Sequence, residues 1–236
     1  QGHSLQLSRR NIRGGRARAV VINSGNANAC LGPAGDRDAL AMAKAVADHL
    51  QCPESEILTG STGVIGKKMN MPAIKAGIDA AFAGLDDSIE AACRAEQAIM
   101  TTDLIPKSCV VEFELDDTAV RVAGMAKGSG MIHPDMATMI GVITTDCAVD
   151  ATTLHQLLRS AVSKTFNRVS VDGDTSVCDM VVILANGAAG NRPVRPDTPE
   201  AARLLAAIEK ISTELSRLIA RDGEGATKLV EIRVDG

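Results

Sequence analysis

The chain has 236 residues, 45% of them hydrophobic, so it is long enough to bury a core in one large or two small domains. Its formal net charge is −4 and it has no Trp or Tyr, which argues against a basic nucleic-acid-binding face and an aromatic base-stacking platform. The cysteines and histidines form no CxxC or HExxH pattern, and no apolar run is long enough to span a membrane. We therefore expect a cytoplasmic protein with no metal and no nucleic-acid or membrane partner.

Hydrophobic periodicity and turn residues predict the elements in chain order. Strands are expected at 16–23 and 56–59, separated by a helix at 37–50. Helices at 72–84 and 86–99 follow, and then a hairpin within 107–125 around Asp116-Asp117. The remaining elements are strands at 138–145, 166–171, 178–185 and 227–234, a helix at 150–164 capped by Asp150 or Thr152, and a helix that starts at Thr198-Pro199 and stops at Gly223. This mixture predicts an α/β or α+β fold with several antiparallel neighbours.

Thr138 stands where the loop His133-Pro134-Asp135 enters an apolar strand. Thr is a common strand former, and its hydroxyl can simply bind the backbone. In a strained loop, however, such a hydroxyl can attack the preceding carbonyl carbon, and hydrolysis of the resulting ester cuts the chain between Ala137 and Thr138. The freed α-amino group has an ordinary pKa of about 7.7–8.0 and can take the proton from the threonine hydroxyl. Thr138 would then combine a nucleophile with its base.

A nucleophile of this kind needs donors for the oxyanion of its tetrahedral intermediate. Ser61-Thr62-Gly63 follows a predicted strand, where Gly63 allows close approach of the backbone and Thr62 offers a hydroxyl. The same composition also suits an ordinary turn.

Three further polar residues could contact a ligand. Thr101 follows a predicted helix, Lys127 lies in the Gly-rich stretch 126–130, and Glu224 lies between two glycines after the last helix. No Walker spacing surrounds Lys127, so phosphate binding is weakly indicated, and Lys127 and Glu224 could equally be solvated. The turn Asp172-Gly173-Asp174 could hold a cation or simply be a turn.

These stretches together resemble the ornithine acetyltransferase family, the bifunctional glutamate N-acetyltransferase and amino-acid acetyltransferase of arginine biosynthesis. The matching pieces, which extend over nearly the whole chain, are VINSGNANAC (21–30), STGVIG (61–66), AIMTTD (98–103), AKGSGMIHPDMATM (126–139), TTD (144–146), FNRVSVDGDTS (166–176), LANG (184–187) and DGEGATKLVE (222–231). Asp135 stands where many members have Asn.

The resemblance implies cleavage between Ala137 and Thr138, and a division into a part at 1–137 and a part at 138–236. It implies an N-terminal-nucleophile-like layered fold in which Thr138 carries the acetyl group from N-acetylornithine to glutamate. It assigns oxyanion stabilisation to Thr62 and Gly63, and substrate contacts to Thr101, Lys127, Glu224 and Thr138 itself. No cofactor is implied, although some members accept acetyl-CoA as the donor, and the cut halves assemble as an α2β2 heterotetramer.

The family's sequence extends beyond both ends of this chain, so we expect the chain to match a middle portion and to leave apolar surface uncovered. Two alternatives to the transferase remain open. A hydrolase or aminopeptidase would use the same threonine and let water remove the acyl group. An uncleaved fragment would bind amino acids weakly or not at all.

Overall fold

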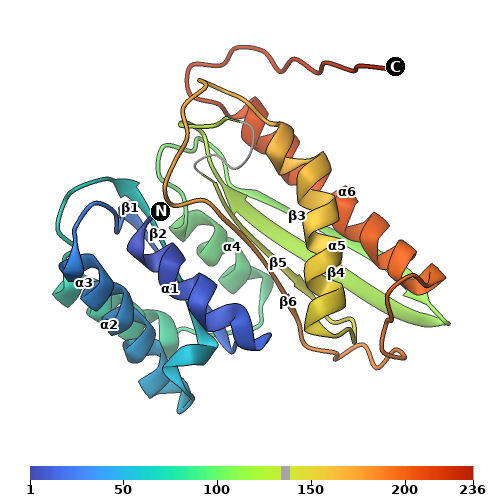
Figure 1. The fold of residues 1–236 in the computed structure, drawn as a ribbon, viewed down its shortest axis with the longest axis horizontal. Coiled ribbons are helices and arrows are strands. Elements are labelled where there is room, and N and C mark those ends of the chain that lie inside the picture. Colours follow the sequence, from blue (N-terminus) through green and yellow to red (C-terminus); the bar gives the residue numbers. More distant parts are fainter. Residues whose placement is uncertain (134–138, 236) are drawn as a thin grey trace.

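The structure is a computed structural model that describes residues 1–133 and 139–235. Its helices are α1 (His3–Asn11), α2 (Pro33–Leu50), α3 (Met71–Ala83), α4 (Ile89–Ala98), α5 (Ala151–Lys164) and α6 (Pro199–Arg221), with 3-10 turns η1 (Ile12–Gly14), η2 (Glu54–Glu56) and η3 (Phe166–Arg168). Its strands are β1 (Ala19–Asn26), β2 (Ile57–Val64), β3 (Lys107–Leu115), β4 (Thr118–Lys127), β5 (Ile140–Thr145) and β6 (Met180–Ala185). The expected α/β class is confirmed, and Figure 1 shows helices packed on two separate groups of strands.

The first group is a two-stranded parallel sheet of β1 and β2. A parallel pair requires a crossover connection, which α2 supplies. Both α1 and α2 pack against β2, and the small core between them contains Leu7, Ala43 and Ile57. Pro33 occupies the first turn of α2, where it costs no intrahelical hydrogen bond.

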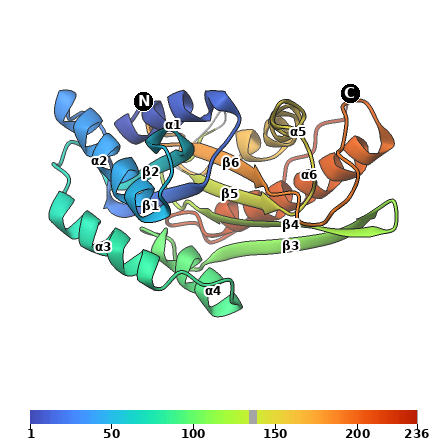
Figure 2. The same cartoon turned by 90° about the horizontal axis from the view of Figure 1, so that it is seen from below.

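The second group is a four-stranded sheet in the order β3-β4-β5-β6. The first two pairings are antiparallel, and β5 and β6 are parallel with α5 in their crossover. The predicted hairpin is confirmed, since β3 and β4 meet at Asp116 and Asp117, with φ of +46° and +62°, as two-residue hairpin turns require. Figure 2 shows this hairpin reaching away from α2 and α3.

The main core lies between this sheet and the helices α5 and α6, which cover one of its faces (Figure 1). The α6 stripe was expected from its spacing, and Leu204, Ile208, Ile211 and Leu215 are all fully buried. Gly124 on β4 permits this approach, because a Cβ there would lie 2.8 Å from the Ile211 side chain.

The opposite face of β5 and β6 packs on the first sheet through a second core made by Leu58, Ile140, Val142, Met180 and Val182. The two sheets are therefore held face against face, and side chains from β2 and β4 can meet in the interior between them.

Helix α1 was not expected from the sequence. Its buried residues are Ser4, Leu7 and Ser8, so it lacks a continuous apolar stripe. Hydroxyl groups complete the contact: Ser8 Oγ donates to the Thr59 carbonyl at 2.8 Å, and the Thr59 N–H donates back to Ser8 Oγ at 2.6 Å. A helix buried through hydrogen bonds escapes a hydrophobic-pattern search.

Strand β2 is longer than predicted. The expected strand at 56–59 extends to Val64, so Thr62 and Gly63 lie within a strand and not in a turn. The extension pairs Thr62 with Ser24 and Gly63 with Gly25 of β1.

Two predicted strands are wrong. Residues 166–168 form the 3-10 turn η3, which contacts α5 and α6 and buries the side chain of Phe166. Residues 169–171 are irregular. Residues 227–234 pair with no described strand and run outward after α6 (Figure 1). The apolar residues of this stretch are exposed, to 74% at Val230 and 83% at Ile232.

Candidate active site

Two of the threonines singled out in the sequence, Thr62 and Thr101, are hydrogen-bonded to the amine of Lys127. Lys127, the last residue of β4, donates from Nζ to Thr101 Oγ1 at 2.5 Å and to Thr62 Oγ1 at 3.3 Å. Lys127 and Thr62 are almost fully buried, whereas Thr101 is exposed. Two of the three N–H donors of the ammonium thus bind hydroxyls of the described residues, one of them on an exposed threonine.

Burial lowers the pKa of Lys127, and the positive charge of Lys107 lowers it further. The nearby Asp103 carboxylate acts in the opposite direction and raises this pKa. Asp103 Oδ2 lies 3.8 Å from Lys127 Nζ, too far for a direct hydrogen bond. The amine is therefore in a poorly solvated place and only partly compensated, a setting in which an anionic ligand interacts strongly.

A buried ion cluster holds the surrounding chain segments. Lys107 Nζ donates to Asp103 Oδ1 at 2.7 Å and to Asp222 Oδ2 at 2.6 Å, and all three side chains are at most 4% exposed. The cluster connects the start of β3 to the C-terminal end of α6, where Asp222 is the cap residue.

Asp103 also holds the backbone of Thr101 and of Gly128, the residue after Lys127. It accepts the Gly128 N–H at 2.7 Å and the Thr101 N–H at 3.1 Å. Burial alone would raise the pKa of Asp103, but these two hydrogen bonds and the ammonium of Lys107 outweigh it and lower this pKa. Asp103 therefore stays charged and sets the relative position of Thr101 and Lys127.

Gly63 occupies a position that only glycine fits. Its φ is +123°, and a Cβ there would lie 2.3 Å from the carbonyl carbon of Gly25. The glycine thus lets β1 and β2 remain side by side immediately after Thr62.

Glu224 lies beside the loop that follows Lys127. Its N–H donates to the Ser129 carbonyl at 2.8 Å, and a Cβ on Gly130 would lie 2.6 Å from Glu224 Oε2. Glu224 is exposed, and its negative charge only partly opposes the effect of burial, which lowers the pKa of Lys127.

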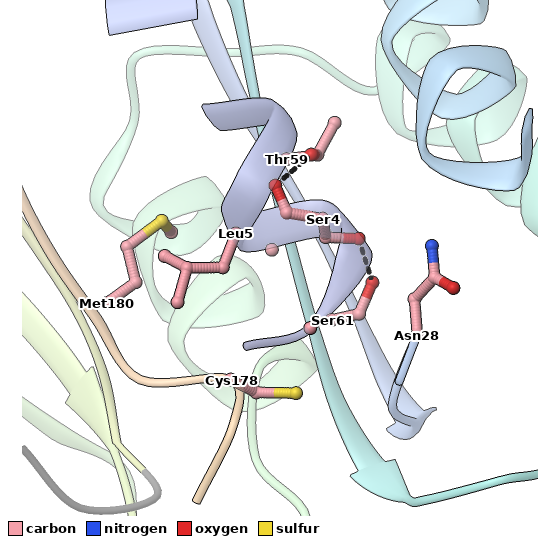
Figure 3. A pocket seen from close by; sticks show the side chains of 9 residues that line it. Ser4, Leu5, Asn28, Thr59, Ser61, Cys178 and Met180 are labelled. Carbon is pink, nitrogen blue, oxygen red and sulfur yellow. Dashed lines mark hydrogen bonds between the residues drawn. The ribbon is translucent and has the colours of Figure 1, made fainter. Parts of the chain in front are cut away.

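A small cavity adjoins the site on the other side of β2. Figure 3 shows Ser4, Ser61, Cys178 and Met180 around it, with the hydroxyls of Ser4 and Ser61 hydrogen-bonded at 2.7 Å. Its volume is about 10 Å³, enough for about one water molecule and too small for an amino acid. Because side chains alternate along a strand, Ser61 serves this packing while Thr62 points to Lys127.

Ala137 and Thr138, the predicted cleavage residues, lie outside the described residues, as does Asp135. The following residues are described: Met139 is buried, and Ile140 is the register partner of Lys127. The chain therefore enters β5 at the end of the sheet that carries the lysine.

Asp179, which the sequence analysis did not single out, contacts this entry. Its Oδ1 accepts the Met139 N–H at 3.2 Å, and it is 6% exposed. Burial raises the pKa of Asp179 to about 6, against the opposing effects of the Met139 N–H, Ser176 and Lys127. Asp103, Lys107 and Asp222 were also missed, although Asp103 and Asp222 each lie within two residues of Thr101 or Glu224.

The described ranges contain no group of three or more His, Cys, Asp or Glu residues arranged to bind a metal. Asp172, considered as a cation ligand, instead accepts the backbone N–H groups of Met131 at 2.6 Å and Ile132 at 2.9 Å. In the same part of the chain, no helix combines the length and apolarity that a membrane crossing needs.

Comparison with known proteins relates the whole chain to one family. The family model for ArgJ matches residues 1–236. An arginine biosynthesis bifunctional protein ArgJ from Symbiobacterium thermophilum is 49% identical over 230 residues, which are 98% of this chain and 57% of that protein. Its counterpart in Listeria monocytogenes is 45% identical over 94% of this chain and 54% of its own length. The chain thus spans about half the length of the curated relatives it matches.

Two solved structures are also similar. An arginine biosynthesis bifunctional protein ArgJ from Bacillus halodurans superposes with a TM-score of 0.54 at 38% identity, covering 58% of this chain and 71% of that chain. An ornithine acetyltransferase from Mycobacterium tuberculosis, solved in complex with ornithine, gives a TM-score of 0.51 at 34% identity, covering 57% of this chain and 71% of that chain. The match to the family model over all 236 residues, together with these relatives, shows that the chain belongs to the ArgJ family.

Proposed function

We propose that this chain is part of a self-cleaving acetyltransferase of arginine biosynthesis. In this proposal the Thr138 hydroxyl attacks the Ala137 carbonyl carbon, the peptide C–N bond breaks, and water hydrolyses the ester. Ala137 then ends one part, 1–137, and Thr138 begins the other with a free amine. Family membership and the names of the relatives support the arginine biosynthesis role.

The acetyl group is then transferred in two steps. Thr138 Oγ attacks the acetyl carbonyl of N-acetylornithine, the amide bond breaks, and ornithine leaves with the proton. The amino group of glutamate next attacks the acetyl-threonine ester, so that N-acetylglutamate forms and the hydroxyl is restored. The related M. tuberculosis structure, an ornithine acetyltransferase with bound ornithine, supports this choice of substrate class.

The observation that carries the proposal is that Thr62 and Thr101, from two distant segments, both bind the buried amine of Lys127. In the proposed site, Thr62 and the backbone at Gly63 stabilise the oxyanion. Lys127 and Thr101 bind the substrate carboxylate, and Glu224 binds its amino group, so a zwitterionic substrate meets opposite charges at its two ends.

The test uses the complete protein that carries this chain. N-acetylornithine is supplied with and without glutamate, and both ornithine and N-acetylglutamate are measured. Ornithine release that depends on glutamate and matches N-acetylglutamate formation is the expected result. Equal ornithine release without glutamate would instead identify a hydrolase.

The Thr138→Ala variant should lose the activity, whereas Thr144→Ala, which removes an exposed hydroxyl from β5, should retain it. Retention of transfer by Thr138→Ala would refute the nucleophile. We also propose that acetyl-CoA is a second acetyl donor, which is tested by supplying it in place of N-acetylornithine. We further propose an α2β2 assembly, which predicts a native mass equal to two copies of each part.

A further inference from the structure

One loop contacts the chain on both sides of the predicted cleavage segment. On the first side, Asp172 accepts the N–H groups of Met131 and Ile132, and the Val171 N–H donates to the Ile132 carbonyl at 2.9 Å. The loop 171–180 therefore binds the residues directly before 133–138 through three hydrogen bonds.

On the second side, the end of the same loop binds the residue after the segment. Asp179 accepts the Met139 N–H at 3.2 Å, and the Met180 N–H donates to the Met139 carbonyl at 3.0 Å. Both polar groups of the Met139 backbone are thus held, one by a side chain and one by the main chain.

We propose that the loop 171–180 is a positioning clamp for self-cleavage, in which Asp172 and Asp179 hold the backbone on either side of the bond between Ala137 and Thr138. This inference rests on the proposed self-cleavage and adds to it the residues that set its rate. All residues of the clamp are described, and they act through the backbone of Ile132 and Met139, so they are positioning residues.

The physical reason lies in the geometry that an intramolecular attack requires. A hydroxyl reacts with a neighbouring carbonyl carbon only from a narrow range of distances and angles, and holding the reacting groups there contributes a large part of the rate. The described contacts hold the backbone at Ile132, before the proposed scissile bond, and at Met139, after it, and holding the chain in place is the general way in which such an attack is favoured.

Two details favour a device that serves this segment. Met131 has a φ of +56°, a conformation unfavourable for a side-chain-bearing residue, and its N–H is one of those held by Asp172. The loop also contacts the start of α1, the helix that packs on β2, because the Gly2 N–H donates to the Val177 carbonyl at 2.6 Å. The loop therefore has contacts both with α1, which packs on the first sheet, and with the start of β5 in the second sheet.

The test measures cleavage rates of the complete protein by intact mass, from synthesis onward. Asp179→Ala removes a buried charged acceptor and should slow cleavage by about 10-fold or more, the equivalent of a hydrogen bond to a charged group. Asp172→Ala acts at an exposed site and should slow it by about threefold. Asp179→Asn keeps an oxygen that accepts the Met139 N–H, and should cleave within about threefold of the unaltered protein.

The matched control is Asp174→Ala, which removes another exposed carboxylate of the same loop and should leave the rate unchanged. Thermal unfolding of each variant separates slow cleavage from failure to fold. Wild-type rates in both alanine variants, or an Asp179→Asn variant as slow as Asp179→Ala, would overturn the clamp. An unaltered protein that is never cut would instead refute the proposed function, so the two failures are distinguishable.

Discussion

The buried ion cluster makes a sharp prediction for stability. In the Lys107→Met variant, Asp103 and Asp222 would face each other without the ammonium that now lies 2.7 Å and 2.6 Å from their oxygens. Methionine fills a similar volume, so the change isolates the charge. Breaking a buried pair in this way costs about 3–5 kcal/mol.

For a chain of this size, each kcal/mol lowers the unfolding midpoint by about 2–4 °C, so the Lys107→Met variant should melt at least about 6 °C lower. Differential scanning calorimetry at neutral pH provides the measurement. The matched control is Lys164→Met, whose ammonium lies 2.6 Å from Glu209 but is 53% exposed. An exposed pair contributes about 0–1 kcal/mol, so this variant should lose less than about 4 °C.

A second variant tests the cause. Adding Asp222→Asn to Lys107→Met removes one of the two carboxylates left without the Lys107 ammonium, while Asp103 stays charged 3.8 Å from Lys127, so this double variant should recover part of the lost stability. Equal melting temperatures for Lys107→Met and Lys164→Met, or a double variant less stable than Lys107→Met, would refute the reasoning.

Three other predictions address the site. Gly63→Ala should lower the free energy of unfolding by more than about 3 kcal/mol, because the new Cβ would lie 2.3 Å from the carbonyl carbon of Gly25. The control Gly66→Ala, at a residue with φ +76° and open space around it, should cost about 1 kcal/mol. Equal losses of stability in denaturant titrations would contradict this prediction. Burial raises the pKa of Asp179 to about 6, from about 3.9 for an ordinary aspartate, so its ionisation destabilises the fold as pH rises through this interval. Asp179→Asn should therefore increase the free energy of unfolding by up to about 3 kcal/mol near pH 8 and by little near pH 4. Equal effects at the two pH values would contradict this prediction. Lys127→Ala should raise KM for carboxylate substrates by more than it slows self-cleavage, and an equal loss of both would refute its role in binding.

Patterns with strong local rules were predictable from the sequence. The two aspartates at the β3–β4 turn, and Thr198 with Pro199 at the start of α6, each report a local conformation, and the structure has both. The resemblance of short motifs also selected Thr62, Thr101 and Lys127, which the structure brings into contact.

Features that depend on tertiary pairing were not predictable. The partners of Lys107 lie 4 and 115 residues away, and no local pattern reveals that these groups meet in the interior. Helix α1 was missed because serines form much of its buried face. Conversely, residues 227–234 alternate as a strand does, yet a strand forms only where a neighbour supplies hydrogen-bond partners.

The central claim is that a cut before Thr138 frees the amine that activates its hydroxyl. The most direct measurement is N-terminal sequencing of the purified complete protein after separation under denaturing conditions. The account predicts a second N-terminus that begins Thr-Met-Ile-Gly in the unaltered protein, and its absence in Thr138→Ala. A fully active preparation in which every molecule remains uncut at residue 137 would contradict the account.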